Sequence, residues 1–205
     1  MKNEYSFSEK LSSLYALVLT RLFYRRARLI RRPFYIRGRK RFVYSEGFTT
    51  GHHCRFDLLG SDDDLTPTLF IGKNCKMGDN VHIVATREVR IGDGCLFASK
   101  IFIGDTEHGN YSGGDNESSP DVPPDERKLF AKPIRIGNRV WIGENVCVLS
   151  GSTIGDGSII GANSVVTGSI PAGCIAIGIP ARVVKRYHPE TGKWEKTGGT
   201  EKNVG

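Results

Sequence analysis

The most regular feature of this chain is an aliphatic residue that recurs every six positions, often followed by glycine. The residue four places after each of these is small or β-branched, as at Cys75, Val81 and Ser152. A weaker run of the same period precedes them at Ile36, Phe42, Phe48 and Cys54. The clear repeats are Ile71, Met77 and Ile83; Ile91, Phe97 and Ile103; and Ile136, Ile142, Val148, Ile154, Ile160, Val166 and Ala172.

A period of six predicts a solenoid of short flat strands. It matches neither the 3.6-residue period of an amphipathic helix nor the alternation of a simple strand. Three strands joined by corners would make one triangular coil, with the aliphatic residue inside and glycine or asparagine relieving the corner. Such coils stack at about 4.8 Å and bury their core only against neighbouring coils. We therefore predict an all-β solenoid over residues 36–180.

One long insertion interrupts the repeat between Ile103 and Ile136. Its residues 105–132 are polar, include Pro120, Pro123 and Pro124, and have no helical or strand period. A long loop inside a regular repeat usually has a function. We therefore predict that residues 105–132 form the catalytic loop.

The two ends of the chain differ from the solenoid. Residues 1–35 carry Leu11, Leu14, Tyr15, Val18, Leu22 and Leu29 at helical spacing, which predicts one amphipathic helix interrupted by Pro33. Between Arg21 and Arg41 there are ten Lys or Arg residues and no acid. The segment could pack on the base of the solenoid or on a neighbouring subunit, or contact an anionic membrane, and these readings are compatible. Residues 181–205 are expected to form a basic tail.

Composition narrows the function classes. The net charge of +7 lies mostly in the basic block, so nucleic-acid binding by the whole protein is not indicated. Five cysteines without a CxxC motif argue against a disulfide framework or a zinc cluster and favour a reducing compartment. The apolar run 11–20 is too short to span a bilayer. We expect a cytoplasmic protein, with peripheral attachment to the inner membrane as a further expectation.

His108 is the one histidine in the insertion and the candidate general base. A neutral imidazole with a pKa of about 6.5 can accept the proton of a substrate hydroxyl as that oxygen attacks. Asp105 or Glu107 could hold the other ring nitrogen and fix the tautomer. His82 should point outward, towards an acceptor or a subunit contact. His52 and His53 beside Cys54 are not expected to bind metal.

The chain from Ile103 onward resembles the bacterial O-acetyltransferases of lipopolysaccharide, capsule and colanic acid synthesis. It is also similar to the galactoside and maltose acetyltransferases, and the resemblance covers roughly residues 30–195. Many proteins of these families carry a lysine directly after the position of Thr167, where this chain has Gly168. The matching motifs are Asp105-x-x-His108-Gly109, Pro123-Pro124-x-x-Arg127-Lys128-Leu129, Lys132-Pro133-Ile134-Arg135-Ile136-Gly137, Val140-Trp141-Ile142-Gly143-Glu144-Asn145, and the segments 160–167 and 176–185.

The resemblance implies a left-handed parallel β-helix, a homotrimer, and acetyl-CoA extended along the coils in a groove between two subunits, without a metal. It makes His108 the base. Direct transfer is expected because no nucleophile motif appears, and Asp105 is the candidate partner of the base. Trp141 would pack beside the acetyl end of acetyl-CoA. Arg182 and Lys185 would bind its phosphate. The other expected cofactor contacts are Gly143, Gly161, Ala162 and Thr167, and the expected acceptor contacts are His82, Glu107, Tyr111 and Arg127.

The resemblance points to an acetyl-CoA-dependent sugar O-acetyltransferase of surface polysaccharide biosynthesis, whose carbohydrate acceptor could be lipid-linked. An N-acetyltransferase acting on an amino sugar would use the same donor and is the alternative. A zinc carbonic anhydrase on this fold would need a second histidine five residues after His108, where this chain has Gly113. A non-catalytic solenoid used as a scaffold is the third class.

Overall fold

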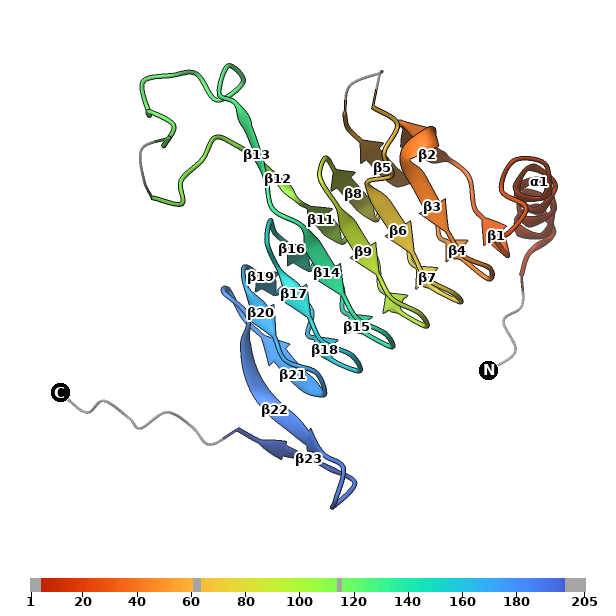
Figure 1. Ribbon diagram of the computed structural model, residues 1–205. Coiled ribbons are helices and arrows are strands. Elements are labelled where there is room, and N and C mark those ends of the chain that lie inside the picture. The colour runs from red at the N-terminus through yellow and green to blue at the C-terminus, as the bar shows by residue number, and fades with distance from the viewer. Residues whose placement is uncertain (1–4, 61–63, 114–115, 198–205) are drawn as a thin grey trace.

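The computed structural model describes residues 5–60, 64–113 and 116–197. The chain winds into triangular coils whose strands stack into three sheets, with a helix at one end and a long loop leaving one edge (Figure 1). Stacked strands within the coils pair in parallel, for example Ile83 with Ile103 and Ile103 with Val148. The predicted all-β solenoid is therefore what the sequence forms.

Each sheet takes every third strand of the coils. The first sheet contains β1 (Leu29–Ile30), β4 (Thr49–Thr50), β7 (Lys76–Met77), β10 (Leu96–Phe97), β15 (Trp141–Ile142), β18 (Ile159–Ile160), β21 (Cys174–Ile177), β22 (Arg182–His188) and β23 (Lys193–Lys196). The second contains β2 (Phe34–Arg37), β5 (Cys54–Leu58), β8 (His82–Ala85), β11 (Phe102–Gly104), β16 (Cys147–Val148) and β19 (Val165–Val166). The third contains β3 (Phe42–Tyr44), β6 (Leu69–Ile71), β9 (Val89–Ile91), β14 (Ile134–Ile136), β17 (Thr153–Ile154) and β20 (Ser169–Ile170).

The core of the solenoid is the column of aliphatic residues that the repeat placed inside. Ile103 and Ile142 are fully buried. Serines in the small-residue position are buried as well, and the Ser152 hydroxyl donates to the Val166 carbonyl at 3.0 Å, so its polar group is satisfied. Cys75 and Cys95, in the same small-residue position of the repeat, are buried free thiols.

The corners use left-handed backbone, which only glycine and short polar residues tolerate well. Asn145 and Asn163 occupy equivalent corners of neighbouring coils with φ of 55° and 60°. The Asn145 side-chain amide donates to the Asn163 side-chain oxygen at 3.3 Å. These asparagines therefore turn the chain and join successive coils.

The N-terminal helix ends earlier than its apolar period suggested. Helix α1 (Phe7–Phe23) begins at Ser6, whose hydroxyl and backbone form a capping box with Glu9. The chain then enters the solenoid at β1, before the expected boundary at residue 36, because Ile30 is fully buried in the first coil. The short 3-10 helix η1 (Arg39–Arg41) precedes β3. Aromatic side chains, including Phe48 and Phe56, fill the core of these first coils.

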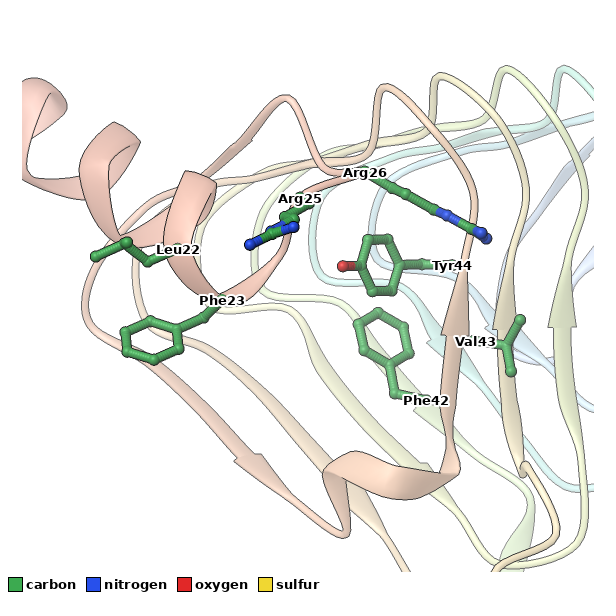
Figure 2. A pocket seen from close by; sticks show the side chains of 7 residues that line it. All are labelled: Leu22, Phe23, Arg25, Arg26, Phe42, Val43 and Tyr44. Carbon is green, nitrogen blue, oxygen red and sulfur yellow. The ribbon is translucent and has the colours of Figure 1, made fainter.

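A shallow hollow separates the end of α1 from β3. It is lined by apolar and aromatic side chains together with two guanidinium groups (Figure 2). The residues that line the hollow are Leu22, Phe23, Arg25, Arg26, Phe42, Val43 and Tyr44.

Among the described residues, α1 and every other helix fall short of the length and apolar character that a bilayer span needs.

The C-terminal segment is ordered structure rather than the expected tail as far as residue 197. Strands β22 and β23 form an antiparallel hairpin that extends the first sheet beyond β21. The hairpin covers the strand edge that the last coil would otherwise expose. Residues 198–205 lie outside the described residues.

The insertion also has regular structure at its base. Strands β12 (Thr106–His108) and β13 (Leu129–Ala131) pair in an antiparallel ladder in which His108 lies opposite Leu129. The sequence period gave no sign of this ladder, because each strand has only three residues. The ladder carries the catalytic candidate away from the solenoid edge between the second and third sheets (Figure 1).

Candidate active site

His108 is the last residue of β12, and its side chain is exposed. The ring atom Nδ1 lies 3.1 Å from the carbonyl oxygen of Pro124. A carbonyl oxygen can only accept, so this hydrogen bond requires the proton on Nδ1 and leaves Nε2 with a free lone pair. The loop thus selects the tautomer that a general base needs.

Tyr111 and Arg127 hold the backbone of His108 from the other side. The Tyr111 hydroxyl donates to the His108 carbonyl at 2.6 Å, and Arg127 Nη1 donates to the Tyr111 oxygen at 2.6 Å. Arg127 also donates through Nε to the Val122 carbonyl at 2.7 Å. A Cβ on Gly109, whose φ is 120°, would lie 2.5 Å from the Tyr111 oxygen. The structure therefore brings the predicted acceptor residues Tyr111 and Arg127 to His108, where they fix the loop.

Asp105 does not orient His108, contrary to expectation. It is fully buried, and its carboxylate accepts backbone N–H groups of Thr86, Arg87 and Glu88 at 2.9, 2.8 and 2.8 Å. The Thr106 hydroxyl donates to it as well, at 2.7 Å. These four bonds use the acceptor capacity of the two oxygens. Asp105 therefore anchors the base of the insertion to the preceding coil.

Glu107 does not contact the His108 ring either. It lies opposite Phe130 in the β12–β13 ladder and is exposed. The group on the second ring nitrogen is therefore a backbone carbonyl rather than either carboxylate considered from the sequence.

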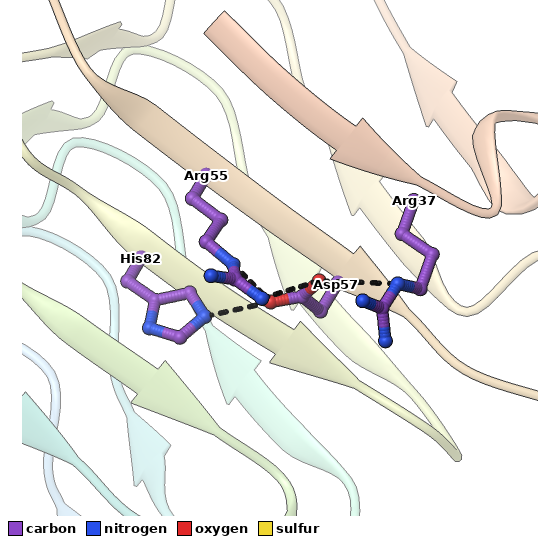
Figure 3. A network of polar contacts seen from close by, with 4 residues as sticks. All are labelled: Arg37, Arg55, Asp57 and His82. Carbon is purple, nitrogen blue, oxygen red and sulfur yellow. Dashed lines mark hydrogen bonds and ion pairs between the residues drawn. The ribbon is translucent and has the colours of Figure 1, made fainter.

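His82 points outward from β8, as expected, and belongs to a polar cluster on the second sheet (Figure 3). Its Nε2 lies 3.0 Å from Oδ2 of Asp57, to which Arg55 Nε donates at 2.6 Å. Arg37 Nε lies 3.8 Å from Asp57 Oδ1. Burial alone would raise the pKa of Asp57, but the hydrogen bonds from Arg55 and His82, together with their charges, outweigh it and lower that pKa. The cluster lies beside β11, which leads into the insertion.

The expected donor residues Trp141 and Lys185 lie on one sheet. Trp141 is half exposed on the outer face of the first sheet. It pairs with Ile159, which pairs with Ile175, which pairs with Lys185. Three strand spacings separate Trp141 from Lys185, roughly 14 Å along the solenoid axis. This column can accommodate an extended ligand with an apolar group at one end and a phosphate at the other.

The remaining predicted donor contacts are distributed around the corners. Arg182 is exposed at the start of β22, Ala162 is exposed at the corner after β18, and Thr167 is exposed after β19. The two glycines have a structural reason of their own. A Cβ on Gly143 would lie 2.7 Å from the Ala162 nitrogen, and one on Gly161 would lie 2.6 Å from the Ile177 side chain. Coil stacking therefore accounts for both glycines.

The candidate base and the expected donor residues lie on different sides of one chain. His108 rises from the edge between the second and third sheets, whereas Trp141 and Lys185 belong to the first sheet (Figure 1).

His52, in an early coil, contacts the backbone: its Nδ1 lies 2.7 Å from the Arg32 carbonyl. Within residues 5–60, 64–113 and 116–197 no group of three His, Cys, Asp or Glu side chains is placed to hold a metal ion.

Comparison with known proteins decides the family. The model of bacterial transferase hexapeptide (six repeats) matches residues 133–168. The chain is 46% identical over 180 residues to WbbJ of Escherichia coli (strain K12), a proposed lipopolysaccharide biosynthesis O-acetyl transferase, covering 88% of this chain and 89% of that protein. The chain belongs to the hexapeptide-repeat acetyltransferases. This acetyltransferase therefore has the left-handed β-helix that the resemblance implied, and the predicted enzyme class is confirmed.

Two further matches come from the same family. Galactoside O-acetyltransferase of Escherichia coli (strain K12) is 38% identical over 123 residues, which are 58% of this chain and 55% of that enzyme. A galactoside acetyltransferase structure in complex with coenzyme A superposes with a TM-score of 0.54 at 31% identity, covering 70% of this chain and 67% of that one. The acetyltransferase described here thus shares its fold with an enzyme solved with coenzyme A.

Sequence reasoning missed the roles of Pro124 and of the turn 86–88. The Pro124 contact uses a backbone carbonyl, which leaves no trace in residue type. The turn did have a signal, because the step from Ile83 to Ile91 is eight residues instead of six. That widened turn directs three N–H groups at Asp105.

Proposed function

We propose that this acetyltransferase moves the acetyl group of acetyl-CoA to a sugar hydroxyl in surface polysaccharide biosynthesis, with His108 as general base. The observation that carries the proposal is the Nδ1 contact of His108 with Pro124, which leaves Nε2 free on an exposed loop. The similarity to WbbJ and to galactoside O-acetyltransferase supports the donor and the sugar acceptor.

The reaction needs no covalent enzyme intermediate. Nε2 of His108 takes the proton of the sugar hydroxyl as its oxygen forms a bond to the thioester carbonyl carbon. The C–S bond then breaks, coenzyme A leaves as the thiolate, and the imidazolium returns the proton to sulfur. Tyr111 and Arg127 keep the ring in position by bonding the His108 backbone, so that much of the rate comes from orientation.

We further propose that the complete site forms between neighbouring copies in a homotrimer. The base and the donor column belong to different sides of one chain, so a second copy that packs its first sheet against the insertion would unite them. Trp141 would then wall the acetyl end while Lys185 and Arg182 bind phosphate. Ala162 and Thr167, which are exposed at corners of the coils, would contact the extended pantetheine part of acetyl-CoA.

The acceptor is assigned to the side of the second sheet that borders the insertion. His82, Arg55 and Arg37 surround the single carboxylate of Asp57, so the cluster retains positive charge. Such a surface suits an acceptor that carries phosphate, as nucleotide-linked and lipid-linked sugars do. Glu107, exposed beside His108, remains a candidate contact for an acceptor hydroxyl.

Product chemistry tests the assignment against its alternative. The full-length protein would be incubated with acetyl-CoA and panels of sugars and amino sugars, and released thiol would be followed. Ester products lose their acetyl group in mild alkali, whereas amides do not. We expect alkali-labile products from hydroxyl acceptors. Alkali-stable products confined to amino sugars would instead establish the N-acetyltransferase.

A further inference from the structure

Helix α1 packs on the solenoid with its small side chains. Ala16 and Thr20 are buried against the first coil, and the Thr20 hydroxyl accepts the Ile30 backbone N–H at 2.9 Å. Ser13 and Leu19 on the flanks of this face are partly buried. The contact that holds the helix therefore uses little of its hydrophobic surface.

The large apolar side chains of α1 form a stripe on the opposite face. At 100° per residue, positions 7, 11, 14, 18 and 22 share one side of the helix, turned away from Ala16 and Thr20. A contiguous exposed apolar surface of this kind marks an interaction site. The exposed fractions along this apolar stripe are 77% for Phe7, 52% for Leu11, 57% for Leu14, 50% for Val18 and 62% for Leu22.

Exposed arginines follow the apolar stripe, in the last turn of α1 and in the segment that leads to β1. Arg21, Arg25, Arg26 and Arg28 are all exposed, and none forms an ion pair within the described part of the chain. A second copy of this surface would bring two such groups of arginines together, and like charges repel. Charge complementarity therefore requires an anionic partner that also accepts apolar side chains.

The hollow at the end of α1 adds a place for one anionic group. It is open to solvent, has a volume of about 470 Å³, and combines Arg25 and Arg26 with the apolar side chains of Leu22 and Phe42 (Figure 2). A phosphate diester with hydrocarbon attached matches this lining, because guanidinium groups bind phosphate and the remaining wall is apolar.

We propose that α1 is an interfacial anchor that docks on an anionic phospholipid bilayer. The apolar stripe would enter the boundary between headgroups and acyl chains, with the helix lying in the plane of the membrane. Arg21, Arg25, Arg26 and Arg28 would contact lipid phosphates. This arrangement keeps the far side of α1 on the solenoid and holds the enzyme next to acceptors made at the membrane.

Vesicle flotation of the full-length protein tests the proposal. Phosphatidylcholine vesicles would be compared with vesicles containing phosphatidylglycerol as the anionic lipid. Each arginine at an anionic surface contributes roughly fivefold in affinity, so binding should be strong at low salt and weaken as salt is raised. Equal flotation with neutral vesicles, or none with anionic ones, overturns the proposal.

Two double variants separate the apolar and charged contributions. Leu14→Ser with Val18→Ser changes the apolar stripe, and Arg21→Glu with Arg25→Glu reverses the charge beside it. Each should reduce flotation at least tenfold. The matched charge control is Lys193→Glu with Lys196→Glu on β23, and the apolar control is the exposed Leu65→Ser. Both controls should float like wild type.

Two further measurements distinguish this proposal from others. Acetyl-CoA binding by calorimetry should be unchanged in the α1 variants, so failure of the anchor and failure of the proposed enzyme function are separable. Size-exclusion chromatography reports on self-association. If the stripe variant dissociates an oligomer and floats like wild type, the stripe is an interface between copies and the proposal is wrong.

Discussion

The His108 ring and the Pro124 carbonyl, sixteen residues apart in the chain, lie 3.1 Å from each other in the insertion. This one contact determines which ring nitrogen is protonated and which is free. A backbone carbonyl cannot take up a proton at physiological pH, so Nδ1 would keep its proton while Nε2 gains and loses one. The tautomer of the proposed base is therefore set by the loop conformation rather than by a carboxylate partner.

Replacing His108 by alanine should remove the general base and leave the donor site intact. We expect kcat/KM to fall roughly 10²- to 10⁴-fold. Acetyl-CoA affinity, measured by calorimetry, should stay the same. The control is His188→Ala, since His188 lies on β22 at the end of the first sheet. Equal turnover by the two variants would show that His108 is not the base.

Asp105→Ala should act on stability first. It leaves three backbone N–H groups of the turn 86–88 without their acceptor, at about 1 kcal/mol or more each, so the free energy of unfolding should fall by roughly 3 kcal/mol. Chemical denaturation measures this fall. Glu107→Ala, at an exposed neighbouring site, should change it by less than about 0.5 kcal/mol. Unchanged stability with a large loss of kcat would restore Asp105 as the orienting group.

Tyr111→Phe should loosen the loop without altering donor binding. The variant loses the bonds to the His108 carbonyl and from Arg127, which corresponds to a roughly 3- to 10-fold drop in kcat. Steady-state kinetics would show this drop at constant KM for acetyl-CoA. Tyr35→Phe on β2 serves as the control. A rise in acceptor KM at constant kcat would instead make Tyr111 a substrate contact, as the sequence suggested.

The proposed site between subunits predicts complementation between two inactive proteins. His108→Ala and Trp141→Ala subunits, unfolded together and reassembled, should regain roughly a quarter of wild-type activity. The reason is that a quarter of randomly formed interfaces would combine an intact His108 with an intact Trp141. Each variant reassembled alone provides the background. Failure of the mixture to exceed that background would place the whole site within one chain.

The polar cluster on the second sheet should make stability sensitive to acid. The pKa of Asp57 is lowered in the folded state, so its contribution is complete above the unfolded value of about 3.9 and is lost as pH falls through the lower folded value. Denaturation midpoints at pH 7 and pH 3 should therefore differ less for Asp57→Asn than for wild type. The exposed Asp125→Asn should follow wild type. If the denaturation midpoints of all three proteins fell by the same amount between pH 7 and pH 3, Asp57 would not have this role.

The fold was predictable because the information that specifies it is local. Each six-residue unit places its own aliphatic residue inside, so Ile103 and Ile142 could be assigned to the core from spacing alone. The first coil escaped this reasoning although Ile30 lies six residues before Ile36, because its neighbour Leu29 was assigned to the amphipathic helix. The C-terminal hairpin escaped it because antiparallel strands 182–196 carry no hexapeptide pattern.

The surroundings of His108 were predictable to the extent that they share one loop. His108, Tyr111 and Arg127 are close in sequence, and the structure joins them by hydrogen bonds. The role of Asp105 depended on a turn in the preceding coil. The eight-residue step from Ile83 to Ile91 marks that turn, but spacing alone cannot show that its N–H groups point at Asp105. The apolar period of α1 was read correctly as amphipathic, but spacing could not show that Ala16 and Thr20 would face the solenoid instead of the large side chains.

The most direct test of the central claim is the acetyl content of surface polysaccharide in cells that lack this protein and are supplied with either wild type or His108→Ala. Wild type should restore alkali-labile acetyl esters, detected by NMR and mass spectrometry. The variant, at equal protein level, should restore almost none. Full ester content with the variant, or acetyl groups found only on amide nitrogen, would contradict the account.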